Sequence, residues 1–139
     1  MATLTTHGVI DRFQAVMGAA PIAMTATREP FSHDRQPAGL LTNTYRIEDA
    51  GMGSNTPMSN HMVARIDTLR IWFARKMAFA GQAALEAAED DLVAIERAIV
   101  ADGLAQGYHA VARGRDAKAS GDMVVASITF SVDYDFSEI

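Results

Sequence analysis

Apolar and polar side chains alternate without a break along the last part of the chain, from Met123 to Phe136. The even-numbered positions hold Val124, Ala126, Ile128, Phe130, Val132, Tyr134 and Phe136, and the odd-numbered positions between them hold Val125, Ser127, Thr129, Ser131, Asp133 and Asp135. Because the side chains of a strand point alternately to its two faces, this pattern predicts a long strand. One face is expected to be buried, and the other to be wet or part of an interface.

Two segments show the spacing of three and four residues that is typical of amphipathic helices. The first runs from about Thr5 to Ala20 and carries an apolar face of Val9, Ile10, Phe13, Val16 and Met17. The second runs from Ala83 to Ala101 and carries an apolar stripe of Leu85, Ala88, Leu92, Ile95 and Ile99. We predict that the even-numbered face of the final strand packs against this second helix.

Three further strands are predicted, at Leu40–Glu48, Met62–Arg75 and Tyr108–Arg113, with a turn at 114–121 before the final strand. In the long middle strand, Ile66 has the opposite parity to Leu69, which suggests a bulge or a strand that is covered on both faces. Proline, glycine, serine and asparagine gather at about 21–39 and 49–61, where we expect long loops.

These elements predict a single α+β domain over residues 1–139, in the order helix, strand, strand, helix, strand, strand. A mainly antiparallel sheet of about four strands is expected to pack on one face against both helices. The length fits one domain, and the absence of Cys excludes disulfides and thiolate metal sites. No apolar stretch approaches the roughly 20 residues of a membrane span, so we expect a protein that is neither secreted nor membrane-embedded.

Motifs of catalysis and cofactor binding are missing from the sequence. The four histidines, His7, His33, His61 and His109, have no partner at the i, i+4 spacing of a metal pair, and neither a phosphate-binding loop nor a GxSxG motif is present. The acids Glu89, Asp90 and Asp91 can be read as cation ligands, but a solvated helix face is favoured. We expect no catalytic residue, no cofactor and no metal.

Charged residues on two predicted strands are the candidates for an interface between subunits. The basic positions are Arg65, Arg70 and Arg75, and the acidic ones are Asp133 and Asp135. Strand parity places Arg70 on the opposite face from Arg65 and Arg75, so at least one arginine is expected to point away from the helices. Contacts with phosphate or a solvated strand edge are the alternatives. The formal net charge of −5 argues against a protein that mainly wraps nucleic acid.

Four segments resemble a known family in their order and in their pattern of apolar and polar residues. They are the opening helix, the strand VARIDTLRIWFARK, the helix ALEAAEDDLVAIERAI and the final strand MVVASITFSVDYDF. From about Thr5 to Glu138 the chain is similar to the tail terminator proteins of long-tailed, siphovirus-like phages and related phage-like particles. The predicted loop at 21–39 matches no element of that family.

This resemblance implies a non-enzymatic virion protein of the phage tail and neck, assembled in the host cytoplasm. Such a protein forms a homohexameric ring on the last ring of the tail tube, stops polymerisation of the tube protein and joins the tail to the head-side connector or stopper. DNA passes through the ring without sequence-specific binding. Two alternatives stay open: another neck or head-completion protein of the same particle, or a small dimeric α+β enzyme or ligand-binding module, which needs a pocket with convergent polar groups.

Overall fold

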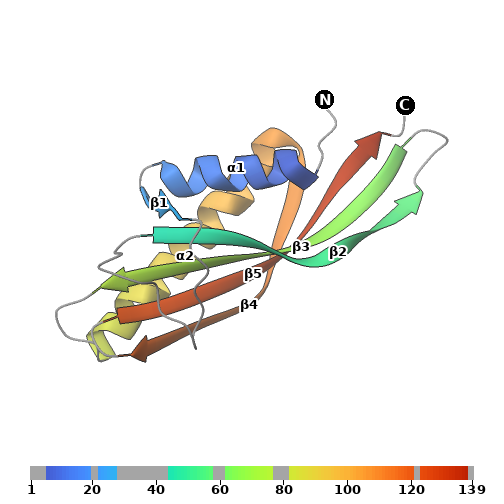
Figure 1. The fold of residues 1–139 in the computed structure, drawn as a ribbon. Coiled ribbons are helices and arrows are strands. Elements are labelled where there is room, and N and C mark those ends of the chain that lie inside the picture. Colours follow the sequence, from blue (N-terminus) through green and yellow to red (C-terminus); the bar gives the residue numbers. More distant parts are fainter. Residues whose placement is uncertain are drawn as a thin grey trace.

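The computed structural model describes residues 6–19, 22–27, 44–57, 62–76, 82–120 and 123–137. Two helices and five strands follow one another in the order α1 (Thr6–Gly18), β1 (Thr25–Ala26), β2 (Thr44–Pro57), β3 (Met62–Lys76), α2 (Gln82–Gln106), β4 (Tyr108–Ser120) and β5 (Met123–Ser137). The fold is α+β, as predicted, with a long twisted sheet and both helices beside it (Figure 1).

The five strands form one mixed sheet in the order β1-β2-β3-β5-β4. All neighbouring pairs are antiparallel except β1 and β2, which run parallel over the two residues of β1. The prediction of about four strands in the order helix, strand, strand, helix, strand, strand therefore missed β1. This strand lies inside the segment that was predicted as a loop, and two residues are too few to show a period in the sequence.

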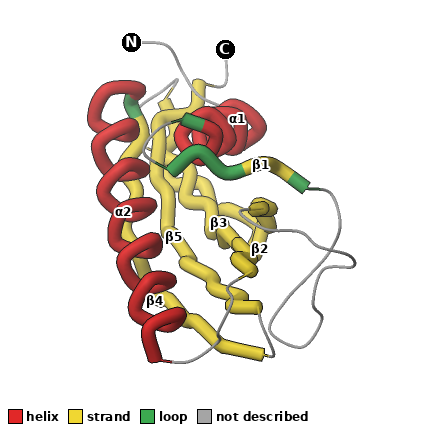
Figure 2. The backbone as a smooth tube through the Cα atoms, turned by 90° about the vertical axis from the view of Figure 1, so that its left-hand side faces the viewer, coloured by secondary structure: helices red, strands yellow, loops and turns green. Residues whose placement is uncertain are grey.

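Both helices pack against the same face of the sheet and share one core with it (Figure 2). This core contains Val9, Phe13 and Met17 of α1, Leu92, Ile95 and Ile99 of α2, and Leu69, Ile71, Phe73, Ile128 and Phe130 of the central strands. Phe13 stands edge-on to Phe130, with ring centroids 5.7 Å apart. Aromatic pairs in this geometry add to the stability that comes from burial alone.

The alternation along β5 is confirmed at every even position whose side chain is described. Val124, Ala126, Ile128, Phe130, Val132 and Tyr134 are all buried. The opposite face of β5 is only partly wet, because Val125 and Ser127 are buried there as well, while Asp133 is exposed. Val125 belongs to a small cluster with Trp72 and Ala74 of β3.

Two strands run on through segments that were predicted as a loop and a turn. β2 continues to Pro57, across most of the predicted 49–61 loop, with register shifts between Asp49 and Gly51 and between Gly51 and Ser54. β4 continues to Ser120 with a shift between Ala112 and Gly114. Bulges of this kind let a strand pass through residues that look like a turn. The bulge suggested for β3 is absent, since β3 pairs with β5 without a shift.

Helix α2 is longer than predicted and ends at Gln106 rather than at Ala101. Gly103 lies within its last turns, where an added Cβ would approach the carbonyl oxygen of Tyr108 to 2.5 Å. Gly107 then takes a positive φ of 97° and donates its N–H to the oxygen of Gly103 at 2.9 Å. Glycine at this position is a usual way to end a helix, and it turns the chain directly into β4.

Candidate interaction surface

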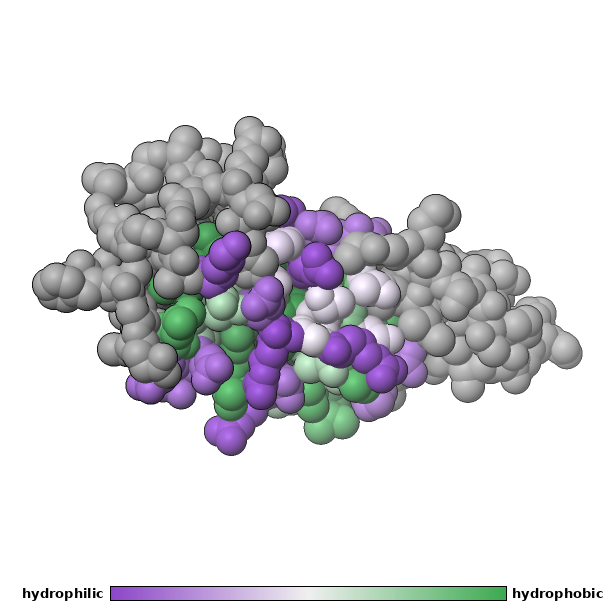
Figure 3. All heavy atoms as spheres, turned by 90° about the horizontal axis from the view of Figure 1, so that it is seen from below, coloured by the Kyte–Doolittle hydropathy of each residue, from purple (hydrophilic) through white to green (hydrophobic). Residues whose placement is uncertain are grey.

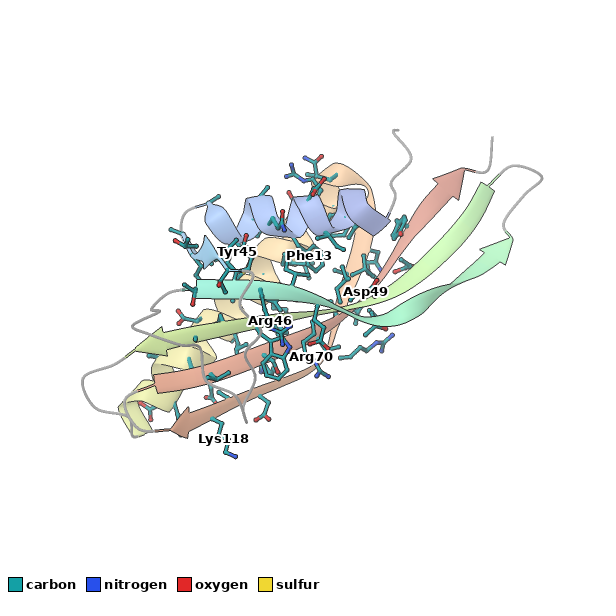
Figure 4. The ribbon with its side chains drawn as sticks, viewed as in Figure 1. Phe13, Tyr45, Arg46, Asp49, Arg70 and Lys118 are labelled. Atoms are coloured by element: carbon teal, nitrogen blue, oxygen red, sulfur yellow. The ribbon has the colours of Figure 1, made fainter. Side chains whose placement is uncertain are left out.

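Residues of four strands, most of them polar, form two rows across the face of the sheet on which none of the described helices lies. We call this the helix-free face. The strand register places Arg46, Trp72, Ser127 and Asp116 in one row, and Glu48, Arg70, Thr129 and Gly114 in the next. Arg46 and Arg70 lie beside one another on this face, whereas Phe13 and Tyr45 lie between α1 and the sheet (Figure 4).

Trp72 is the centre of the contacts on the helix-free face. Its indole Nε1 donates a hydrogen bond of 2.9 Å to Oε2 of Glu48, and the same oxygen lies 3.3 Å from Nη1 of Arg46. The guanidinium carbons of Arg46 and Arg70 each lie 5.5 Å from the centroid of the Trp72 ring. Cation–π contacts at this distance contribute about 0.5–2 kcal/mol each, depending on exposure. The contacts hold both arginine side chains against the sheet.

Arg70 connects this group to β5. Its Nε donates a hydrogen bond of 3.0 Å to Oγ1 of Thr129, and the guanidinium is half-buried. Within the described part of the chain, Arg70 forms no ion pair with a carboxylate.

A shallow hollow of about 270 Å³ lies beside Arg70. It is lined by Arg70, Trp72, Gly114, Arg115, Asp116, Ser127 and Thr129. Gly114 contributes no side chain to this lining, and the space beside it is open, since a Cβ at this position would meet no atom within 4 Å. The lining offers hydroxyl and guanidinium donors next to one carboxylate, which suits a small polar group of a ligand or a partner.

The structure places the residues predicted for the interface as follows. Arg70 points to the helix-free face, as strand parity requires for one of the arginines. Asp133 lies on the same face, is half exposed, and has its Oδ1 3.3 Å from Nδ1 of His109. On β5, four residues separate Asp133 from Thr129, the partner of Arg70, which is about 13 Å along a strand. The two charges thus share a face without touching.

The other three predicted interface residues are described by their backbone only. Register pairs Arg65 with Tyr134, Arg75 with Val124, and Asp135 with Ala64. The side chains of Arg65, Arg75 and Asp135 lie outside the described part of the structure.

A second group of charged side chains joins the two helices to β4, on the other face of the sheet. The Arg12 guanidinium of α1 forms an ion pair with Asp102 of α2 at 2.5 Å, and the Tyr108 hydroxyl donates to Asp102 Oδ2 at 2.7 Å. Burial raises the pKa of the Tyr108 phenol, and the hydrogen bond to Asp102 raises it further. The hydrogen bond with Asp102 also raises the pKa of Arg12. We assign this group a structural role, because each member bridges two packed elements.

Sequence reasoning did not single out Arg46, Glu48, Trp72 or Gly114. The alternation of side chains in β2 did indicate that Arg46 and Glu48 share one face, because they have the opposite parity to Tyr45 and Ile47. The missing information was which strands are neighbours, and only this brings the four residues into two adjacent rows.

Comparison with known proteins leaves the sequence without an assigned family: no protein-family model matches the chain, and no curated protein is significantly similar to it. Among the described side chains, no group of three or more His, Asp or Glu is placed to hold a metal ion. Neither α1 nor α2, over their described lengths, is long and apolar enough to cross a membrane.

Proposed function

We propose that this protein is a structural component of a phage or phage-like particle, a tail terminator that assembles as a homohexameric ring on the end of the tail tube. In this role the ring stops polymerisation of the tube protein and binds the head-side connector, and DNA passes through its centre. The observation that carries the proposal is the shape of the sheet, which extends well beyond the two helices (Figure 1).

The ends of β2, β3 and β5 extend past α1 and α2 (Figure 1). β3 and β5 have 15 residues each, which corresponds to about 50 Å at 3.3 Å per residue. Strands in globular proteins are usually five or six residues long. A sheet end that no described helix covers suits a subunit that contacts a tube on one side and a connector on the other.

A ring of identical subunits needs two different surfaces on each copy, because a heterologous contact joins one patch to another patch of the next copy. Arg70 and Asp133 are the interface candidates whose side chains are described, and Arg65, Arg75 and Asp135 complete the set. Since Arg70 and Asp133 lie on one face, a direct pair between them in two copies requires the helix-free faces to approach each other.

Native mass spectrometry of the full chain, combined with negative-stain electron microscopy, tests the proposal. We expect a species with six times the chain mass of 14.9 kDa and ring-shaped particles. Adding the protein to tail tubes assembled without a terminator is expected to decorate one end of each tube and to stop its growth. A strictly monomeric protein that leaves tube growth unchanged contradicts the proposal.

The same experiment distinguishes a tail terminator from the alternative, another neck or head-completion protein of the particle. Such a protein also forms a ring, but it binds to DNA-filled heads or connectors and leaves the growth of tail tubes unchanged. Pelleting the ring with each of the two particle types therefore distinguishes these roles.

The hollow beside Arg70 favours a ligand-binding module as a second candidate. It has the convergent polar groups that such a module needs, with Ser127 and Thr129 next to Arg70 and Asp116. A dimer of twice the chain mass, together with saturable binding of a small polar ligand that Gly114→Val abolishes, is the result expected for that class.

A further inference from the structure

The sheet ends at the long strand β4 on one side and, on the other, at the two-residue β1 beside the long strand β2. Among the described residues, the outer edges of β4 and β2 are largely unpaired. β4 pairs only with β5, so its outer edge pairs with no described strand. β1 pairs with Thr44 and Tyr45 of β2 but not beyond them, so no described strand pairs with this edge of β2 from Arg46 onward. Open edges offer rows of N–H and C=O groups that can pair with another chain.

The two edges carry opposite net charge. The exposed charged side chains of β4 are three cations and one carboxylate, namely Arg113, Arg115, Lys118 and Asp116. The charged side chains of β2 are one cation and two carboxylates, namely Arg46, Glu48 and Asp49. Hydrophilic side chains are also visible across the middle of the molecule from below, the side on which β4 lies in Figure 1 (Figure 3). Two copies therefore attract through unlike edges and repel through like edges.

The register within the sheet shows which residues of the two edges lie at the same level. Arg46 is paired with Trp72, Trp72 with Ser127, and Ser127 with Asp116. When two copies stand side by side without stagger, Arg46 of one copy thus lies opposite Asp116 of the next.

The neighbouring levels are complementary too. By the same pairing, Glu48 lies at the level of Gly114, and Asp49 at the level of Ala112. Arg113 and Arg115 flank Gly114 in the sequence, and Arg115 lies 4.0 Å from Glu96 of α2 in its own copy. The acids of β2 therefore come beside Arg113. The bulges of the two strands also fall at this level, next to Asp49 and between Ala112 and Gly114, so both edges bend at the same height.

Strand direction is compatible with this contact. β2 and β4 are antiparallel to each other, because three antiparallel pairings separate them. If the next copy is related by rotation about an axis along the strands, its β2 is again antiparallel to the β4 it meets. Each copy contributes four long strands, so alternation of direction continues around a closed ring.

We propose that the β4 edge of one copy pairs antiparallel with the β2 edge of a second copy, in the register that places Asp116 opposite Arg46. This inference rests on the proposed ring and specifies the contact that builds it. Bulges and charges on an edge strand also serve to prevent pairing, and the following experiment decides between these two roles.

Disulfide trapping is well suited to this chain because it contains no Cys. The variant Arg46→Cys with Asp116→Cys cannot close a bond within one copy, since three strand spacings of about 4.8 Å separate the positions and a disulfide needs Cα atoms within about 7 Å. Mild oxidation is expected to give a ladder of covalent oligomers that ends at six subunits. The control Arg46→Cys with Lys118→Cys shifts one position by two residues, about 7 Å along the strand, and is expected to cross-link at least about tenfold less.

The two single-cysteine variants test for symmetric contacts. A covalent dimer from Asp116→Cys alone shows β4 pairing with β4 and overturns the proposal, as does a ring that fails to cross-link in the double variant. If the ring forms but the double variant does not cross-link, the native mass still supports the ring. The failure of the proposed edge contact is then distinguished from a failure of the proposed function. A monomeric wild type overturns both.

A charge variant that leaves the Trp72 contacts intact gives a second measurement. Arg113→Glu reverses an exposed charge of β4, and Arg97→Glu makes the same change at an exposed position of α2. We expect the fraction of ring in the Arg113 variant to fall at least about tenfold, because the new carboxylate faces the acids of β2. An unchanged ring in the Arg113 variant, or an equal loss in the Arg97 variant, overturns the proposed contact.

Discussion

Arg70 and Asp133 lie on the same face of the sheet, the face that is turned away from both helices. Arg70 reaches this face through its hydrogen bond to Thr129, which shares the odd parity of Asp133 on β5. In a ring that is joined edge to edge, Asp133 of one copy and Arg70 of the next are separated by three strand spacings, about 14 Å across the sheet, and by about 13 Å along the strands. A direct pair between them forms only if two helix-free faces meet.

Charge reversal at Arg70 and Asp133 distinguishes a ring that is joined edge to edge from an assembly in which two helix-free faces meet. For an edge-to-edge ring, we expect Asp133→Lys to leave the number of subunits in the native oligomer unchanged. We also expect any loss of assembly in Arg70→Glu to persist when Asp133→Lys is added, because the two charges do not meet. Native mass spectrometry of the single and double variants measures this. Recovery of the oligomer in the double variant shows instead that helix-free faces are in contact.

Phe130 is the clearest test of the core. Its side chain is fully buried and packs on Phe13, so Phe130→Ala is expected to lower the free energy of unfolding by about 3–5 kcal/mol. Leu104 is the matched surface control, since it is 81% exposed and Leu104→Ala should change stability by less than about 0.5 kcal/mol. Urea unfolding of both variants gives the two values. A loss below about 1 kcal/mol at Phe130 contradicts the described core.

Gly103 and Gly18 form a pair of helical glycines with opposite surroundings. A Cβ at position 103 approaches the Tyr108 carbonyl oxygen to 2.5 Å, whereas a Cβ at position 18 meets no atom within 4 Å. Gly103→Ala is therefore expected to destabilise the protein by about 1–3 kcal/mol in spite of its better helix propensity. Gly18→Ala should be neutral or stabilising by up to about 1 kcal/mol. Equal thermal shifts in the two variants are incompatible with the close contact between α2 and β4.

Tyr108 makes stability depend on alkaline pH. Burial and the hydrogen bond to Asp102 raise its pKa in the folded state above the unfolded value of about 10. Stability from this group is therefore complete below about pH 10 and falls as the pH rises above it, by about 1.4 kcal/mol per pH unit for one proton. Tyr45, whose pKa burial also raises, contributes in the same direction.

Measurements of the unfolding free energy between pH 8 and pH 11.5 check this prediction, because this range spans the unfolded tyrosine pKa of about 10. Tyr108→Phe is expected to be less stable than the wild type at neutral pH, because it loses the hydrogen bonds to Asp102 and Ile99. Its decline at high pH should be shallower, since one titrating group is removed. Parallel curves for the two proteins indicate that the pKa of Tyr108 is the same in the folded and the unfolded state, which contradicts the prediction.

The periodic pattern of single segments was sufficient to predict the helices and the long strands β3 and β5. The period of two in β5 identified the buried even positions from Val124 to Tyr134, but not the burial of Val125 and Ser127 on the other face. The stripe from Leu85 to Ile99 identified the face of α2 that meets the core. Parity alone also placed Arg70 on the face opposite Leu69. These features depend on the geometry of one element, in which each side chain's direction follows from its place in the sequence.

Only the tertiary structure decided where strands continue and which residues become neighbours. Gly114 looks like part of a turn in the sequence, yet pairing with Thr129 keeps it in β4, because the hydrogen bonds of a sheet come from another strand. Trp72 of β3 gains its contact with Arg46 from the neighbouring strand β2. The hollow beside Arg70 of β3 is lined in part by Gly114 of β4, which lies two strands away from β3. Such contacts join residues that are distant in the chain, so no local period records them, and strand pairing alone determines them.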